Sequence, residues 1–221
     1  MAAHDNIYSD LHDRLVIGEF PPGQRLKPED LSQHYSASGS AIREICHRLA
    51  SVGLLDYQEQ RGFRLPPQSA VLRSDLTRFR IVLECEGARR SIRNGGIAWE
   101  ARLIAAHHKL SHIESRVRSD RGSVDLLKMW TQTELEFHQT LIEECGLEVL
   151  IQTHRVIYQR FRQQLIISDR SFVFVPENIV QHAAILDAAL ARDEGLIATL
   201  IQEHLVRNLE RKIPDTDADA G

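Results

Sequence analysis

Histidine is frequent in this chain, with 11 among 221 residues, and some stand where they could hold a metal ion. Glu134 and His138 are four residues apart, which places them on one face of a predicted helix. His182 and His204 are flanked by apolar residues on two later predicted helices, so both are expected to point inward. One carboxylate and three imidazoles would suit Zn²⁺, Ni²⁺ or Mn²⁺, with coordination positions left open. Spacing alone fits equally well three core histidines that are satisfied by hydrogen bonds.

The other histidines form weaker patterns. His108 and His112 have the i, i+4 spacing at which two imidazoles on one helix can share a metal ion, and His107 precedes them. The rest are isolated in the sequence: His4, His12, His34 and His154. We expect most of these residues to be incidental.

The segments that carry the four candidate ligands are predicted to be helical. From residue 70 onward there is no convincing strand pattern, and breakers such as Asn94-Gly95-Gly96 and Gly146 separate the helical segments. These segments are 71–93, 97–119, 123–144, 147–167, 176–191 and 194–212. Because short loops favour antiparallel neighbours, we predict an antiparallel bundle of six or so helices, and metal sites are often built in the core of such a bundle.

A second stretch with chemical potential, Ser38–Leu49, is predicted to form a helix with two distinct faces. Its apolar positions follow helical spacing: Ile42, Ile45, Leu49 and, just beyond, Val52. A polar stripe repeats in the same way: Ser40, Arg43 and His47. Ser38 precedes the first turn and is a favourable N-cap.

The surroundings of this helix predict a winged helix-turn-helix, the DNA-binding arrangement of a helix, a turn, a second helix and a two-stranded wing. The expected parts are a first helix at 5–17, a second at Pro28–His34, a hairpin at Leu54–Leu65 that turns at Gln58–Arg61, and a stiff linker at Pro66–Ser69. The predicted fold is therefore mainly α. Its expected divisions are a DNA-binding domain at 1–66, a linker at 67–70, an effector-binding, metal-binding and dimerisation domain at 71–213, and a disordered acidic tail at 214–221.

In such a fold the second helix and the wing contact DNA. Arg43 is the main candidate, because arginine can make two hydrogen bonds to guanine O6 and N7. The alternative is a solvent-facing arginine paired with Glu29 or Glu44. Ser38 and Ser40 could donate to a phosphate near the N-terminus of the helix. The other candidates lie further along that helix and at the wing tip: His47, Arg48, Arg61 and Gly62.

The charge of the chain gives weak support to DNA binding. The formal net charge is −4 and the pI about 6.3. Residues 1–67 hold seven basic against nine acidic residues, and only 38–65 are slightly basic, with four arginines against three acids. A nucleic-acid-binding domain usually has a strongly basic face, so the prediction depends on the residue pattern.

The composition favours a cytoplasmic protein. Three cysteines, Cys46, Cys85 and Cys145, lie far apart, which suits reduced thiols better than a disulfide framework. No apolar run approaches the roughly 18 residues of a membrane span, and the N-terminus lacks the features of a signal peptide. We expect no membrane partner.

Several segments of the sequence resemble the motifs of a known family. In the first half they are Gly18–Leu26, Leu31, Ser38–Leu49, Gly53–Leu55 and Arg61–Gly62, which resemble the GntR family of bacterial transcription regulators. In the second half they are Arg80–Glu84, Glu134–His138, His182 and His204, which resemble the FadR-type branch with its effector-binding FCD domain. The resemblance implies a homodimer that binds a palindromic operator and responds to a small organic acid, often with a metal in the helical domain.

The resemblance also assigns roles to single residues. It favours a metal site over satisfied core histidines, with Glu134 standing where the family more often has Asp. Arg80 matches an arginine that lies near the effector pocket in relatives, and the alternative is an intrahelical pair with Glu84. Where the family usually has Ser-Arg-Thr-Pro-Val-Arg-Glu, this chain has Ser-Gly-Ser-Ala-Ile-Arg-Glu, so Gly39 replaces an arginine that commonly reaches DNA.

The expected function is therefore a ligand-responsive transcription regulator, expected to be a repressor, whose helical domain binds a small carboxylate at a divalent metal. One alternative is a helical metalloenzyme, although no Ser-His-Asp order, phosphate-binding glycine loop or second metal cluster is found. Another is a regulator that senses a metal, or is stabilised by it, without an organic effector. We expect no enzymatic activity.

Overall fold

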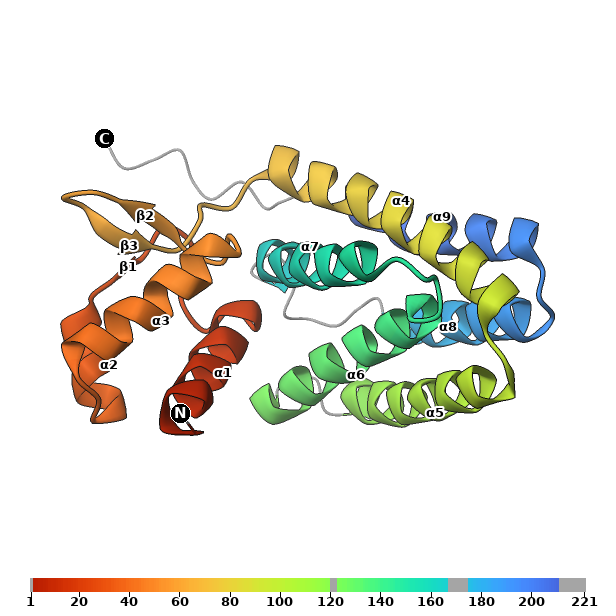
Figure 1. Cartoon of the computed structure of the whole chain (residues 1–221), viewed down its shortest axis with the longest axis horizontal. Coiled ribbons are helices and arrows are strands. Elements are labelled where there is room, and N and C mark those ends of the chain that lie inside the picture. The colour runs from red at the N-terminus through yellow and green to blue at the C-terminus, as the bar shows by residue number, and fades with distance from the viewer. Residues whose placement is uncertain (1, 120–122, 167–174, 211–221) are drawn as a thin grey trace.

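The computed structural model describes residues 2–119, 123–166 and 175–210, which form a small winged unit at one end and a helical bundle at the other (Figure 1). The winged unit contains α1 (Ala2–Val16), β1 (Arg25–Leu26), α2 (Pro28–Tyr35), α3 (Gly39–Ser51), β2 (Asp56–Gln58) and β3 (Gly62–Arg64). The bundle contains α4 (Ala70–Asn94), α5 (Ile97–Ser119), α6 (Val124–Ile142), α7 (Glu148–Ile166), α8 (Val175–Leu190) and α9 (Glu194–Glu210). The mainly α fold is confirmed.

The helix-turn-helix forms where the sequence predicts it. The Ser38 side chain caps α3 by accepting a hydrogen bond from the Ala41 amide at 3.3 Å. Gly53 follows α3 with a φ of +77°, a left-handed conformation that glycine adopts without strain. The apolar face of α3 packs with α1 and the wing in a core that includes Leu11, Leu15, Leu31, Ile42, Ile45, Leu49 and Phe63.

The wing differs from the predicted hairpin in two ways. A third strand is present, because β1 pairs antiparallel with β3 and gives the order β1-β3-β2. The first hairpin strand begins at Asp56, while Leu54 and Leu55, predicted to lie in it, are buried core residues. The predicted turn is present, with the Arg61 amide donating to the Gln58 carbonyl at 3.0 Å.

The bundle encloses its own apolar core, centred on Trp99, Leu103, Trp130, Phe137 and Ile201. α5 packs along α6 and α8, and α4 packs along α7 and α9. The helix ends agree with the breakers in the sequence, since α4 ends at Asn94 and α5 begins at Ile97. The tail predicted at 214–221 lies outside the described residues.

The two units contact each other through more than the linker. Asp13 on α1 accepts from Lys128 and from Gln132 on α6, each at 3.1 Å. On α7 the Gln163 side chain donates to the Leu54 carbonyl at 3.0 Å, and Gln164 donates to the Pro67 carbonyl at 3.1 Å. The winged unit is therefore attached to α6, which carries two of the candidate metal ligands, and to α7.

Membrane insertion finds no support in the helices described. None of them combines the length and the apolar character that crossing a bilayer requires.

Candidate metal centre and DNA-binding surface

The four candidate ligands come together in the bundle. Glu134 and His138 extend from α6, His182 from α8 and His204 from α9, and one ligand atom from each lies within 4.8 Å of the others. All four residues are buried, with exposed fractions between 0% and 4%. Residues separated by up to 70 positions in the sequence thus form one cluster that could hold a metal ion.

The imidazoles are oriented by partners at Nδ1. His138 Nδ1 donates to Glu84 at 2.8 Å, His182 Nδ1 to Glu114 at 3.0 Å, and His204 Nδ1 to Gln181 at 2.9 Å. Because a carboxylate can only accept, the hydrogen of His138 and His182 is on Nδ1 and their Nε2 carries a free lone pair. Metal-ligating histidines are typically held in this way.

The Nε2 atoms distinguish between a metal site and core histidines that are satisfied by hydrogen bonds, the two hypotheses that the sequence spacing left open. Nε2 of His138 and Nε2 of His182 are buried without a hydrogen-bond partner. A buried polar atom left unsatisfied costs about 1–3 kcal/mol, so histidines with a purely structural role would be expected to have partners on both nitrogens. The donor set and its orphaned nitrogens fit a divalent transition metal.

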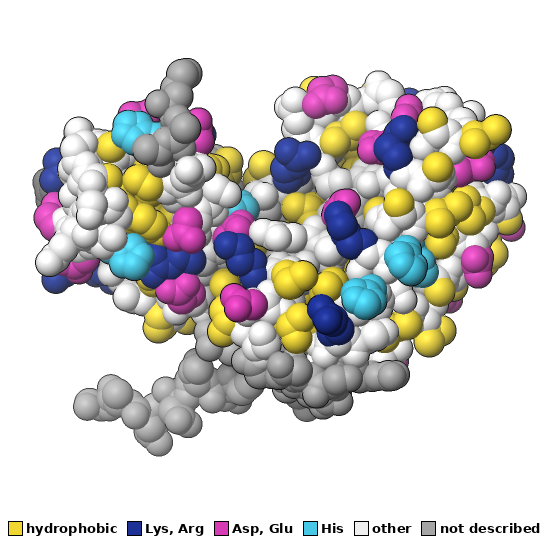
Figure 2. Space-filling view, turned by 90° about the horizontal axis from the view of Figure 1, so that it is seen from below, with side chains coloured by type: hydrophobic (Ala, Val, Ile, Leu, Met, Phe, Trp, Pro, Cys, Tyr) yellow, Lys and Arg dark blue, Asp and Glu magenta, His cyan; other side chains and the backbone are white. Residues whose placement is uncertain are grey.

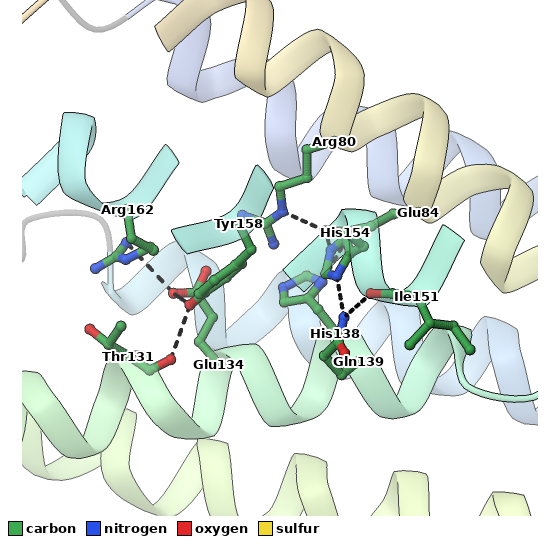
Figure 3. A network of polar contacts seen from close by, with 10 residues as sticks. All are labelled: Arg80, Glu84, Thr131, Glu134, His138, Gln139, Ile151, His154, Tyr158 and Arg162. Atoms are coloured by element: carbon green, nitrogen blue, oxygen red, sulfur yellow. Dashed lines mark hydrogen bonds and ion pairs between the residues drawn. The ribbon is translucent and has the colours of Figure 1, made fainter. Parts of the chain in front are cut away.

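Glu134 completes the set as an ionised carboxylate. Its Oε2 accepts from the Tyr158 hydroxyl at 3.0 Å and lies 3.6 Å from Arg162 (Figure 3). Burial alone would raise its pKa, but Arg162 and Arg80 outweigh burial and hold the pKa of Glu134 below its ordinary value. The charges of Arg162 and Arg80 therefore keep Glu134 in the form that ligates metals.

Arg80 is fully buried beside this cluster and forms an ion pair with Glu84. Its guanidinium carbon lies 4.8 Å from the Tyr158 ring centroid and 5.3 Å from that of Phe161. The intrahelical pair considered in the sequence is present, but it is buried and so differs from the weak surface pair expected. One guanidinium nitrogen, Nη2, is buried without a partner, which leaves an N–H group for a ligand.

Sequence reasoning missed the residues around the ligands. Glu84 binds His138 through Oε2 and His154 through Oε1, the latter at 2.7 Å, as Figure 3 shows. His154, isolated in the sequence and expected to be incidental, is fully buried in this network, and its other nitrogen contacts Gln139. Glu114 was missed although a signal existed, because it falls on an apolar helical face with Leu110, Ile113 and Val117. An acid at a core position needs a hydrogen-bonding or oppositely charged partner.

The paired histidines of α5 do not join this cluster. His108 and His112 are exposed, and no metal-binding group among the described residues includes them. Their metal-like spacing is therefore a surface feature, as expected.

Burial of the imidazoles predicts a pH effect on the metal-free protein. Burial lowers the pKa of His138 to about 4, although Glu84 acts in the opposite direction. Between pH 4 and 6.5 the unfolded chain binds a proton that the folded protein excludes, so stability falls as pH falls. At pH 5 we expect a loss of about 2 kcal/mol for this histidine, measured by urea unfolding against pH 7. A His138→Gln protein that loses as much stability as wild type would contradict this cause.

On the winged unit, the polar stripe of α3 is exposed as predicted. Arg43 has 62% of its side chain exposed and lies 3.2 Å from Glu29, so it is both solvent-facing and paired with an acid. Gly39, at the start of α3, has open space around it, since an added Cβ would meet nothing within 4 Å. Space therefore does not exclude a larger side chain, such as arginine, at this position.

The other predicted DNA contacts have mixed surroundings. The His47 ring packs edge-on against Tyr57 at 4.6 Å and Phe63 at 4.9 Å, which joins α3 to the wing. Arg48 lies over the ring of Tyr8 on α1 at 4.3 Å. Arg61 is exposed at the wing tip. None of these contacts tests a role in DNA binding, so the assignments stay predictions.

The third strand, β1, adds a basic residue to the predicted two-stranded wing. Arg25 on β1 is exposed and pairs in register with Arg64 on β3, so the wing presents Arg25, Arg61 and Arg64. Acidic and basic side chains are otherwise interspersed over both units in the view of Figure 2. The three-stranded wing is therefore more basic than the predicted two-stranded hairpin alone.

An Arg43→Ala protein is expected to bind its operator about 1–3 kcal/mol more weakly, the value of one good base contact. Fluorescence anisotropy with a labelled operator would measure the change. Arg102→Ala is a suitable control, because it removes another exposed arginine, which pairs with Glu143 and Glu144 in the bundle. Equal affinities of the two variants would remove Arg43 from the DNA-binding set.

Comparison with known proteins agrees with both units. Residues 3–65 match the family model of bacterial regulatory proteins of the gntR family, and residues 75–207 match that of the FCD domain. The chain is 34% identical over 201 residues to the HTH-type transcriptional regulator BphR of Paraburkholderia xenovorans, covering 90% of this chain and 80% of that protein. It is 26% identical over 203 residues to the HTH-type transcriptional repressor GlaR of Escherichia coli, covering 90% of each.

Solved structures show the same fold. The structure of E. coli McbR/YncC superposes with a TM-score of 0.78 at 19% identity and covers 95% of this chain and 96% of that one. A GntR regulator from Rhodococcus sp. RHA1 gives a TM-score of 0.76, also at 19% identity, with the same coverage. The relatives and fold neighbours are transcription regulators and not enzymes. The chain thus belongs to the GntR family of DNA-binding transcription regulators, with a C-terminal FCD domain.

Proposed function

We propose that this regulator is a homodimeric repressor that binds a palindromic operator and responds to a small carboxylate bound at a divalent metal in the FCD domain. The proposed metal ligands are Glu134, His138, His182 and His204. The proposed DNA contacts are Ser38, Ser40, Arg43, His47, Arg48, Arg61 and Gly62. Its place of action would be the cytoplasm, where the DNA is.

The observation that carries the proposal is the pair of orphaned nitrogens, Nε2 of His138 and Nε2 of His182, in a closed cluster with Glu134 and His204. A bound metal would satisfy both nitrogens and would act as a Lewis acid toward an anionic ligand. Zn²⁺ is the first choice for this nitrogen-rich donor set, with Ni²⁺ and Mn²⁺ as alternatives.

Arg80 gives the site its proposed preference for carboxylates. Its charge is fully buried, and its Nη2 group has no partner inside the protein. A guanidinium binds a carboxylate oxygen through a charge-assisted hydrogen bond, which is stronger than a neutral one. A small organic acid that approaches the metal would therefore find a second fixed point at Arg80.

The contacts between the units offer a route for the response. Glu134 on α6 is bound by Tyr158 and faces Arg162 on α7, and the next residue, Gln163, holds the Leu54 carbonyl beside the wing. A ligand that favours one arrangement of α6 and α7 would shift the population of winged units that match the half-sites. This coupling requires a different affinity of the ligand for the two states.

The test is binding of the full-length protein to a labelled fragment from the region upstream of its own gene. Affinity is expected to fall steeply with salt, because phosphate contacts release counterions, and to change when Zn²⁺ and a panel of small hydroxy- and dicarboxylates are added. A response to Zn²⁺ alone would favour the metal-sensing alternative. Binding that neither metal nor any acid alters would rule out the proposed response.

A further inference from the structure

Glu114 lies on α5, a helix that supplies none of the four candidate ligands. Its neighbours on the same helical face, Leu110, Ile113 and Val117, belong to the apolar core. Glu114 itself is 0% exposed. A carboxylate at such a position is costly unless it is paired and fully hydrogen-bonded.

Only one of the two carboxylate oxygens of Glu114 has hydrogen-bond partners. Its Oε1 accepts from His182 Nδ1 at 3.0 Å and from Trp130 Nε1 at 3.4 Å. Its Oε2 is buried without a partner. Within the described part of the chain its ion-pair partner is His182, and neither a lysine nor an arginine pairs with it. The metal-free fold therefore does not explain why an acid stands here.

Glu84 provides the contrast. It makes the same contact to a ligand histidine, His138, at 2.8 Å. However, Arg80 balances its charge, and His154 donates to its other oxygen. The charge of Glu84 is thus compensated within the metal-free fold. Glu114 has no such arginine or lysine in the described part of the chain.

We propose that Glu114 is a positioning residue of the metal centre, which acts on the metal through His182. Its Oε1 holds the hydrogen of His182 on Nδ1 and so turns the Nε2 lone pair toward Glu134, His138 and His204. Its negative charge would be compensated by a metal ion that His182 Nε2 holds. This inference rests on the proposed metal site. It adds that Glu114 stabilises the metal-bound protein and destabilises the metal-free protein.

The proposed role predicts two effects of removing the charge of Glu114. The stability of the metal-free protein should stay the same or rise, and the affinity for the metal should fall. In Glu114→Gln the charge is removed, and the amide can also turn its NH₂ group toward His182 and favour the tautomer with Nε2 blocked. The full-length metal-free variant is expected to unfold at the same urea concentration as wild type or a higher one. Its affinity for Co²⁺, used alone as the probe, is expected to fall about 10–100-fold, with altered visible absorption bands of the bound ion.

Glu136→Gln is the matched control, since it removes an exposed glutamate on α6 that pairs with Lys109 of α5 at 2.8 Å. It should leave both the Co²⁺ affinity and its absorption bands unchanged. A Co²⁺ affinity of Glu114→Gln within twofold of wild type would overturn the positioning role and leave the metal site standing. A metal-free variant that is clearly less stable than wild type would show that Glu114 merely supports the fold. Wild type that binds no Co²⁺ would instead refute the metal site itself.

Discussion

His182→Ala and His204→Ala proteins are expected to purify without stoichiometric metal, whereas wild type should keep about one divalent ion per chain in its four-ligand site. Each variant loses one imidazole of a buried cluster whose ligand atoms lie within 4.8 Å of one another. The loss of affinity should exceed the 10–100-fold typical of removing an outer partner. Elemental analysis of the purified proteins would measure the bound metal.

The same variants should also lose thermal stabilisation by metal. Wild type should gain about 4 kcal/mol of stability when free Zn²⁺ or Ni²⁺ is about 1,000 times its dissociation constant, because the metal binds the folded state alone. His108→Ala is the matched control, since it removes an exposed histidine on α5 outside the cluster. Wild type without metal and without stabilisation would contradict the site, and so would full metal content in both variants.

Arg80→Ala is expected to destabilise the folded protein by about 3–5 kcal/mol, because it leaves Glu84 as an uncompensated buried charge. Both side chains are almost fully buried, with 1% and 0% exposed. Burial alone would raise the pKa of Glu84, but Arg80 and His138 hold that pKa well below its ordinary value, so the lost arginine matters while the carboxylate stays ionised. The free energy of urea unfolding at pH 7 would measure the change.

Arg90→Ala provides the comparison within the same helix. Arg90 pairs with Glu86 at the same i, i+4 spacing, but both side chains are more than 40% exposed, and such pairs contribute less than about 1 kcal/mol. The double variant Arg80→Met with Glu84→Gln should recover much of the lost stability, because neutral groups of similar volume carry no buried charge. Equal effects of Arg80→Ala and Arg90→Ala would show that burial does not govern the pair.

The sequence predicted what depends on local chemistry. Helix ends followed from breakers such as Asn94–Gly96, and the cap of α3 followed from Ser38. The inward direction of His182 and His204 followed from helical periodicity, which assigns a residue to a face of its helix. Each of these inferences needs only residues within a few turns of one another.

The parts that sequence reasoning missed depend on neighbours far along the chain. β1 has only two residues and exists because β3 lies beside it, so no periodic pattern marks it. The contact of His154 with Glu84 joins α7 to α4, and periodicity does not say which helices pack together. Arg43 was predicted to contact either DNA or an acid, and its pairing with Glu29 leaves the first alternative to experiment.

The contacts by which α7 holds the winged unit end on backbone atoms. Gln163 and Gln164 donate to the carbonyls of Leu54 and Pro67, and the Ser69 amide donates back to Gln164. Every residue except proline offers the same main-chain donor and acceptor, so these bonds tolerate side-chain substitution in the segments they hold. Substitution of side chains in the winged unit or the linker would therefore leave the acceptors and donor of these bonds in place, so the attachment of the winged unit to α7 does not depend on which side chains α3 and the wing present.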